Sequence, residues 1–367
     1  MTPTKPTTET APTGTAPAAP ESLAGLVQQA ERAGASDMHF QMRGKVAEVG
    51  FRLEGMITPI RELPAEIAER VFGRIKFLAR LKTYQESLPQ DGRIPQGELP
   101  CRNDLRVATY PTVTGEKIVL RLFQTATSKT LDDLGLAAGA RAELEAFLRQ
   151  TSGLLLLTGP AGSGKTTTIY ACLRELAGLG GRHIITVEDP VEQIVPGTMQ
   201  TEINEAMGLD FARAARHLLR QDPQVLILGE IRDEATAQLA VRAGLTGHLV
   251  ISTLHAGSCR GVFERLQVLC TDHSAVARAV ELVLNQRLMR KVCPACEGAG
   301  CETCLHTGYA GRRPLVEWLR VGEAQRDQIR RRELAGLVAL QTLEAAGRVL
   351  VNQGVTNEAE FKRIFGL

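Results

Sequence analysis

The segment Gly159-Pro-Ala-Gly-Ser-Gly-Lys-Thr166 constrains the fold more than any other part of this sequence. It follows the apolar run Leu154–Leu157 and leads into a stretch with helical spacing, Lys165–Leu176. Strand, glycine-rich loop and helix in this order are the context in which the pattern G-x-x-x-x-G-K-[ST] forms a phosphate-binding loop. Glycines let backbone N–H groups converge on phosphate oxygens, and the helix N-terminus adds a favourable partial charge. The alternative is a chance glycine-rich turn, which the flanking strand and helix disfavour.

The residues of this loop have separate expected tasks. The amine of Lys165 is expected to reach the β- and γ-phosphates of a nucleotide, and the hydroxyl of Thr166 to hold Mg²⁺. The sequence therefore predicts ATP and Mg²⁺ as ligands. The expected nucleotide-binding residues of this segment are Gly159, Pro160, Ala161, Gly162, Ser163, Gly164, Lys165, Thr166 and Thr167.

Short runs that are apolar on both faces alternate with helical segments through the second part of the chain. This pattern is typical of a parallel sheet covered by helices on both sides. The expected strands are Leu154–Leu157, Ile184–Val187, Val225–Leu228 and Leu249–Ile251. The clearest expected helices are Phe211–Arg220, Glu234–Ala243 and Ala275–Lys291, and Glu323–Phe365 is expected to be helical with a few breaks.

The first part of the chain predicts a smaller α/β domain. Met1–Pro20 is rich in Thr, Pro and Ala and is expected to be a disordered tail. After it, helical spacing begins at Leu23, alternation typical of a strand runs from Val49 to Leu53, and Pro64 opens a second helix. Two further strands are expected at Leu105–Tyr110 and Lys117–Phe123. The predicted division is a tail (1–20), a first domain (21–123), a linker (124–130) and a second domain (131–367) with C-terminal helices over 320–367.

Composition limits the classes of partner. The formal net charge of +2 over 367 residues lacks the basic excess of a dedicated nucleic-acid binder, so no nucleic acid is expected. No apolar run approaches the roughly 18 residues of a membrane span, and the N-terminus does not match a signal peptide. We therefore expect a cytoplasmic chain that reaches the inner membrane through partners, with its cysteines reduced.

Acidic residues follow two of the predicted strands. Glu188 and Asp189 end the run Ile184–Val187, and Glu230 follows Val225–Leu228. Because the carboxyl ends of parallel strands meet at one edge of a sheet, these groups are expected on the side of the phosphate loop. ATP hydrolysis needs acidic groups near the metal and near the attacking water. Solvated strand-end carboxylates are the alternative, and Asp189 has an equal claim to shaping the turn before Pro190.

Thr253 and His255 follow the fourth predicted strand and are expected at the same edge. A polar side chain there could sense the γ-phosphate, although a lone histidine is more often structural.

Four of the eight cysteines form the pattern C-x₂-C-x₄-C-x₂-C, at Cys293, Cys296, Cys301 and Cys304. Each C-x₂-C pair can bind one metal, and four thiolates make a closed tetrahedral Zn²⁺ site with a structural role. The module is expected over residues 293–304. Four free thiols, a redox disulfide, or replacement of one thiolate by His306 are the alternatives.

Several segments together resemble the secretion and pilus ATPase superfamily, on the branch of type II secretion and type IV pilus-assembly ATPases. The likeness covers roughly residues 35–365. Ile185-Thr-Val-Glu-Asp-Pro-Val-Glu192 is similar to that family's Asp box, Leu219–Thr236 to its atypical Walker B region, and Gly247–His255 to its His box. Ala35-Ser-Asp-Met-His39 resembles the opening of the family's N-terminal domain.

The resemblance implies a RecA-like P-loop NTPase domain preceded by a small PAS-like α/β domain. It implies that Glu188 is the catalytic glutamate and that Glu230 is the Walker B glutamate near Mg²⁺. It also implies that His255 couples nucleotide state to subunit contacts, with His248 as a second candidate for this role. It further implies two pairs of arginines that contact phosphate. These are Arg106 and Arg121 from the first domain and Arg216 and Arg220 as arginine fingers, with surface ion pairs as the alternative for each.

The resemblance also implies partners. The chain would form a homohexamer that acts on an inner-membrane platform protein, with a possible membrane adaptor. The cysteine module is typical of the assembly branch, whereas pilus-retraction ATPases generally lack it. The rival readings are a retraction motor, a zinc-containing nucleic-acid translocase, and a nucleotide-binding scaffold that does not hydrolyse ATP. Here the spacer between the cysteine pairs is four residues, shorter than the family's pattern.

Overall fold

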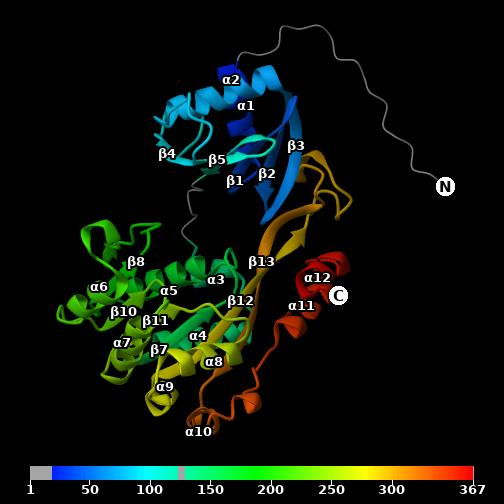
Figure 1. Cartoon of the computed structure of the whole chain (residues 1–367). Helices are drawn as coiled ribbons and strands as arrows, with labels where there is room; N and C mark the ends of the chain where they lie inside the picture. Colours follow the sequence, from blue (N-terminus) through cyan, green and yellow to red (C-terminus); the bar gives the residue numbers. More distant parts are fainter. Residues whose placement is uncertain (1–18, 123–128, 367) are drawn as a thin grey trace. The chain divides into compact units, whose positions relative to one another are not determined.

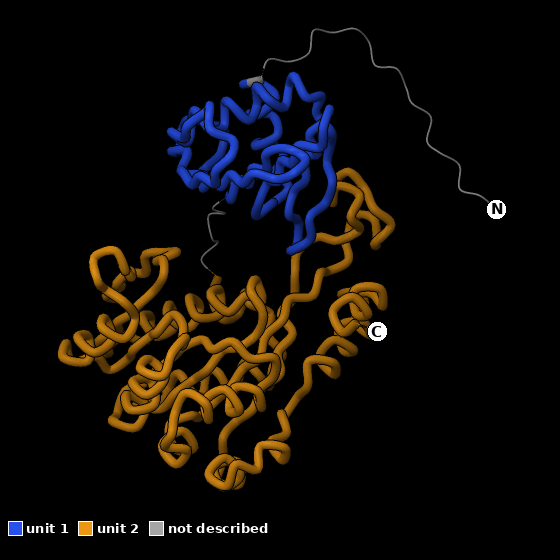
Figure 2. The backbone as a smooth tube through the Cα atoms, viewed as in Figure 1, with its two compact units in different colours: residues 1–125 blue, residues 126–367 orange. Residues whose placement is uncertain are grey.

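The computed structural model describes residues 19–122 and 129–366, which form two compact units, residues 1–125 and 126–367 (Figures 1 and 2). The tail predicted at residues 1–20 lies outside the described residues except for Ala19 and Pro20, which begin a helix. Residues 124–128 of the predicted linker also lie outside them. Among the described residues, no helix is both long enough and apolar enough to span a membrane.

The first unit is a six-stranded antiparallel sheet with two helices. Its strand order is β3-β2-β1-β6-β5-β4. The apolar side chains that predicted the first helix, among them Leu23 and Val27, are fully buried. Its elements are α1 (Ala19–Arg32), β1 (Asp37–Arg43), β2 (Val46–Leu53), β3 (Met56–Pro64), α2 (Ala65–Leu78), β4 (Gln90–Ile94), β5 (Leu105–Thr112) and β6 (Gly115–Leu122).

The second unit is built on a seven-stranded sheet of order β13-β12-β7-β11-β10-β8-β9. All neighbouring strands are parallel except the pair β12 and β13. The strands are β7 (Gly153–Thr158), β8 (Ile184–Glu188), β9 (Met199–Glu202), β10 (Val225–Leu228), β11 (Leu249–Thr253), β12 (Val280–Val292) and β13 (Tyr309–Arg320). This doubly covered parallel sheet confirms the predicted fold class.

Helices cover both faces of this sheet. The α-helices are α3 (Leu131–Leu134), α4 (Ala138–Leu148), α5 (Lys165–Leu179), α6 (Phe211–Leu218), α7 (Glu234–Leu245), α8 (Cys259–Leu269), α9 (His273–Ala279), α10 (Glu323–Arg331), α11 (Leu343–Asn352) and α12 (Glu358–Phe365). Three short 3₁₀ helices are η1 (Glu205–Met207), η2 (Glu302–Cys304) and η3 (Leu334–Gly336). The side chains of Asp210, Asp233 and Ser258 cap the N-termini of α6, α7 and α8.

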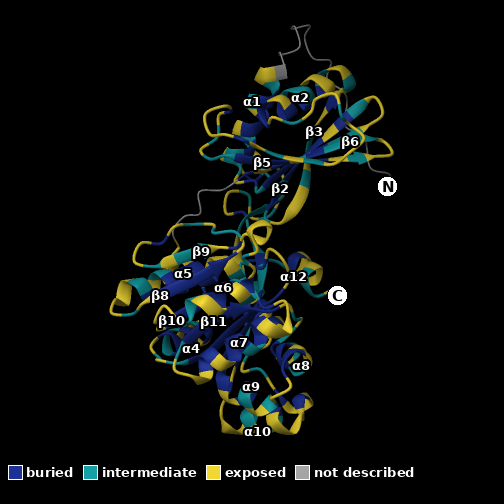
Figure 3. Ribbon diagram, turned by 60° about the vertical axis from the view of Figure 1, so that its left-hand side comes forward, coloured by how far each residue is buried: buried dark blue, intermediate teal, exposed yellow. Residues whose placement is uncertain are grey.

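Alternate residues of each central strand enter two separate cores. Leu154, Leu226 and Val250 pack on the side of α6 to α9, whereas Leu155 and Ile251 pack on the side of α3 to α5. Figure 3 shows these strands as buried between partly exposed helices. Burial on both faces explains why each strand is an unbroken apolar run.

The predicted helix Ala275–Lys291 is wrong. Only its beginning is helical, in α9, and β12 takes over at Val280. Backbone pairing with β7 on one side and β13 on the other satisfies the hydrogen bonds of β12, so tertiary pairing overrides local preference. A register shift between Val280 and Leu282 also breaks the alternation that would have indicated a strand.

Candidate nucleotide site and cysteine module

The carboxyl ends of four parallel strands bring the predicted residues to one edge of the sheet. The phosphate loop, Gly159 to Thr166, follows β7, and Glu188 is the last residue of β8. Glu230 follows β10 by two residues, and His255 follows β11 by two residues. In doubly wound sheets this edge is where ligands bind.

The loop turns sharply between β7 and α5. Gly159 (φ 132°) and Gly164 (φ 89°) adopt backbone angles that side chains with a Cβ rarely adopt. The ammonium group of Lys165 lies over the loop and donates to the carbonyl oxygens of Gly159 (2.9 Å) and Pro160 (3.0 Å). Burial lowers the pKa of Lys165, and the nearby charge of Glu230 partly offsets this. Lys165 and Glu230 are therefore close enough for the charge of one to affect the pKa of the other.

Glu230 is partly exposed and bonds to two cationic or potentially cationic groups. Its Oε1 lies 3.0 Å from His255 Nε2, and its Oε2 accepts from Arg232 Nε at 2.8 Å. Arg232 also approaches Asp189, with Arg232 Nη1 3.8 Å from Asp189 Oδ2. The side chain of Glu230 is 19% exposed, so it remains open to a metal or a water molecule.

The environment of Glu188 differs from that of Glu230, because its carboxylate accepts hydrogen bonds from buried or partly buried side chains. Its Oε1 accepts from Thr186 Oγ1 and from Gln200 Nε2 (3.0 Å), and its Oε2 accepts from the hydroxyl of Tyr170. The Tyr170 oxygen in turn accepts the N–H groups of Glu192 (3.0 Å) and Gln193 (3.2 Å). Burial, followed by the hydrogen bond to Glu188, raises the pKa of Tyr170.

Sequence reasoning missed Tyr170 and Arg232. Tyr170 lies on α5, five residues after Lys165, and its contact with Glu188 depends on how α5 packs on the sheet. Arg232 follows Glu230 by two residues in the quoted Walker B segment, which was the one available signal.

The two histidines of the segment Gly247–His255 lie at opposite ends of β11. His255 is at the carboxyl end, beside Glu230. His248 precedes β11, and its Nδ1 lies 3.1 Å from the carbonyl oxygen of Ala243 at the end of α7. The structure therefore places His248 away from the edge that carries the phosphate loop.

The arginines are distributed over both units. Arg216 on α6 and Arg220 just beyond it line a hollow of about 290 Å³, together with Arg213 and His217. In the first unit, Arg106 on β5 lies directly opposite Arg121 on β6. Both are exposed, and Arg121 Nε donates to Asp37 Oδ1 at 3.0 Å.

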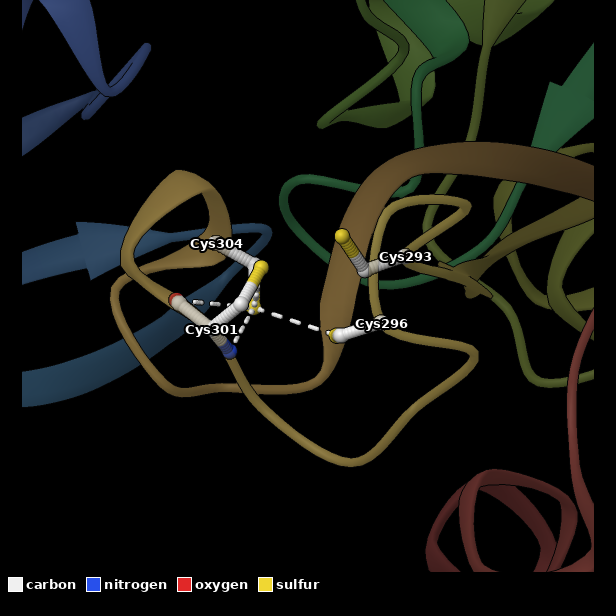
Figure 4. Close-up of side chains that lie close together, drawn as sticks. All are labelled: Cys293, Cys296, Cys301 and Cys304. Carbon is white, nitrogen blue, oxygen red and sulfur yellow. Dashed lines mark hydrogen bonds between the residues drawn. The ribbon is translucent and has the colours of Figure 1, made fainter.

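The four cysteines converge on one point in a loop between β12 and β13 (Figure 4). All four sulfur atoms lie within 4.8 Å of one another, and Cys304 Sγ lies 3.8 Å from the sulfurs of both Cys296 and Cys301. Four thiolates at the Zn–S distance of about 2.3 Å would have sulfurs about 3.8 Å apart in a tetrahedron. The donor set and its spacing therefore fit Zn²⁺.

Backbone N–H groups point at these sulfurs, as expected of metal-bound thiolates. Gly300 N–H donates to Cys296 Sγ (3.2 Å), and those of Cys301 and Gly308 donate to Cys304 Sγ (3.3 Å each). Burial opposes charge on Cys304, but these donors and the neighbouring thiols outweigh it and lower its pKa to about 6.

The chain is similar to known proteins over most of its length. The chain is 37% identical over 346 residues to the protein transport protein HofB homolog of Haemophilus influenzae, covering 93% of this chain and 72% of that protein. It is 35% identical to the type II secretion system ATPase E of Vibrio cholerae (92% and 74%) and 36% identical to the type IV pilus assembly ATPase PilB of Thermus thermophilus (90% and 40%).

Solved structures show the same fold. The Legionella pneumophila ATPase DotB superposes with a TM-score of 0.72 at 21% identity, covering 97% of this chain and 98% of that one. The pilus retraction motor PilT with bound ADP gives 0.64 at 25% identity, covering 93% and 96%. The family described as "Type II/IV secretion system protein" matches residues 13–363, and the chain therefore belongs to that family.

Proposed function

We propose that this chain hydrolyses Mg-ATP to power type II protein secretion or type IV pilus assembly. The observation that carries the proposal is the meeting of the phosphate loop, Lys165, Glu230 and His255 at one sheet edge. Relatives named as type II secretion and pilus-assembly ATPases, at 35% and 36% identity over most of this chain, support it.

The chain's own residues divide the work as follows. Lys165 would exchange its bonds to the loop carbonyls for bonds to the β- and γ-phosphates, and the Thr166 hydroxyl would hold Mg²⁺. Glu230, which bonds to His255 and Arg232, would lie near the metal and orient the attacking water. Glu188 would take part in hydrolysis as a second carboxylate. Its orientation is fixed, because three side chains donate hydrogen bonds to it. The resemblance assigns Arg106, Arg121, Arg216 and Arg220 to the phosphates as further positive charge.

Assembly and partners extend this proposal. A ring of six copies would act on an inner-membrane platform protein, with a possible adaptor, from the cytoplasmic side of the membrane. The names of the relatives support a place beside a secretion or pilus machine.

A retraction motor is the second candidate, because PilT shares the fold at 25% identity. The cysteine module favours assembly, as this module is typical of the assembly branch that the sequence resembles. We propose that the module holds one Zn²⁺ with a structural role, since four thiolates leave no open coordination position.

Hydrolysis by the purified full-length chain tests the proposal. We expect Lys165→Ala and Glu230→Gln each to lower the rate of phosphate release by at least about 10²-fold, the scale of losing one transition-state contact. His183→Gln is a matched control, because His183 is exposed and precedes β8, at the opposite end of that strand from Glu188. Wild-type turnover in both site variants would contradict the assignment.

A further inference from the structure

Gln286 is a buried side chain that contacts the phosphate loop from a neighbouring strand. It lies on β12, is 3% exposed, and is 123 positions from Ser163 in sequence. Its Nε2 donates to the carbonyl oxygen of Ser163 at 2.9 Å, and its Oε1 accepts from Thr168 Oγ1 at 2.9 Å. One amide group therefore connects the end of the loop to the first turn of α5.

The backbone of the loop also fits closely against this residue. A Cβ at Gly159 would lie 2.2 Å from the main-chain oxygen of Gln286, and a Cβ at Gly164 would lie 2.7 Å from Gln286 Nε2. Neither space admits a side chain. The glycines at both ends of the loop thus accommodate β12 as well as unusual backbone angles.

The hydrogen bond to Ser163 has a consequence for anion binding. In a trans peptide unit the C=O and the N–H point in opposite directions. Because the Ser163 carbonyl is held toward Gln286, the N–H of Gly164 in the same peptide unit points away from Gln286. This N–H is one of the donors that a phosphate loop aims at its ligand.

Asn285, the residue before Gln286 on β12, contacts the loop that carries His255. Asn285 is fully buried, and its Nδ2 donates to the carbonyl oxygen of Gly257 at 3.1 Å, two residues after His255. It also donates to Glu317 Oε2 on β13 at 3.0 Å. Two successive residues of β12 therefore support the phosphate loop and the loop that carries His255.

We infer that Gln286 is a positioning residue for ATP hydrolysis, which fixes the Ser163–Gly164 peptide so that its N–H faces the nucleotide phosphates. The inference rests on the proposed function. Gln286 would act through its hydrogen bonds to the loop and to α5.

The first test is Gln286→Met, which keeps the length of the side chain and removes the amide. We expect kcat/KM for Mg-ATP to fall about 10²-fold, the scale of a misplaced binding group. The matched control is Met289→Ala on the same strand. Met289 is buried against the C-terminal helices, so its loss lowers the melting temperature without touching the loop. The control should retain the wild-type kcat/KM.

The second variant, Gln286→Glu, separates positioning from packing. An ionised carboxylate still accepts from Thr168 but opposes the Ser163 carbonyl, whereas a protonated carboxyl regains a donor. Lys165, the charged side chain of the loop, bonds instead to Gly159 and Pro160. The activity of this variant relative to wild type should therefore rise as the pH falls, while that of Gln286→Met stays flat.

The outcomes are distinct. Wild type without ATP turnover refutes the proposed function. Active wild type together with a Gln286→Met variant of equal kcat/KM overturns only the role of Gln286. If Gln286→Met does not fold, a Gln286→Glu activity ratio independent of pH overturns it instead, and a ratio that rises at low pH supports it.

Discussion

At the scale of single residues, the two acidic groups of the candidate site differ in how free they are. Glu188 is 8% exposed and accepts from three side chains, whereas Glu230 is partly exposed and bonds to His255 and Arg232. A carboxylate that must ligate metal or orient water needs a free oxygen lone pair. In the proposed chemistry, Glu230 is therefore the carboxylate that is more open to metal or water. Glu188 is the carboxylate whose orientation is more firmly fixed.

The cysteine module yields a prediction at the same scale. We expect the purified chain to contain about one zinc ion, and the double variant Cys293→Ser, Cys296→Ser to lose it, because two thiolates cannot close a tetrahedral site. Elemental analysis measures the metal. Cys101→Ser is the control, since Cys101 is a partly exposed free cysteine in the other unit. A wild-type chain purified without chelator that contains no zinc would refute the assignment.

Sequence could predict residues but not their distant partners. The phosphate loop, Glu188, Glu230 and the cysteines were visible because local spacing marks them. Gln200 and Tyr170 reach Glu188 from β9 and α5, and Gln286 reaches the loop across 123 positions. Contacts of this kind depend on how elements pack, and no spacing rule encodes them.

At the scale of elements, β12 shows where local pattern fails. Its sequence reads as a helix because apolar residues recur at helical spacing, yet pairing with β7 and β13 makes it a strand. The strands β7, β8, β10 and β11 were predictable because burial on both faces makes each a short apolar run.

The same strand anchors the C-terminal helices through a buried ion pair. Glu360 on α12 is fully buried, and it accepts hydrogen bonds from Arg290 Nη2 on β12 at 2.7 Å and from Arg363. Burial disfavours its charge, but the hydrogen bonds from Arg363 and Arg290 prevail, so its pKa lies below the ordinary 4.5. Because its pKa is lower in the folded state than in the unfolded state, Glu360 stabilises the fold at pH values above the unfolded-state pKa. This stabilisation is lost as the pH falls through the folded-state pKa.

We therefore expect Glu360→Gln to destabilise the second unit by about 3 kcal/mol near neutral pH, because it removes the buried charge that pairs with Arg290, whose side chain is 14% exposed. Its stability should also depend less steeply on pH below about 4.5 than that of wild type. Urea denaturation at several pH values measures both effects. Glu358→Gln on the same helix is the control, since its pair with Arg348 is exposed and worth at most about 1 kcal/mol. Equal effects of the two substitutions would contradict a special role for Glu360.

At the scale of the whole molecule, composition and pattern predicted an α/β fold with a phosphate loop, and the structure confirms that class. The division into two compact units accompanies a division of labour in the proposal. Lys165, Glu230 and the cysteine module belong to the second unit, and Arg106 and Arg121 to the first. The homohexamer and the membrane partners stay predictions, because they depend on the surfaces of other molecules.

The central claim is that the loop after β7 grips the triphosphate of ATP with Lys165 and backbone amides. Equilibrium titration of the purified full-length chain with Mg-ATP tests it most directly. The account predicts wild-type binding in the micromolar to submillimolar range, the usual range of KM for enzymes, roughly 1 μM to 1 mM. It predicts at least about tenfold weaker binding for Lys165→Ala, the equivalent of about 1.4 kcal/mol. A folded wild-type chain that does not bind Mg-ATP, or a Lys165→Ala variant that binds it equally well, would contradict the account.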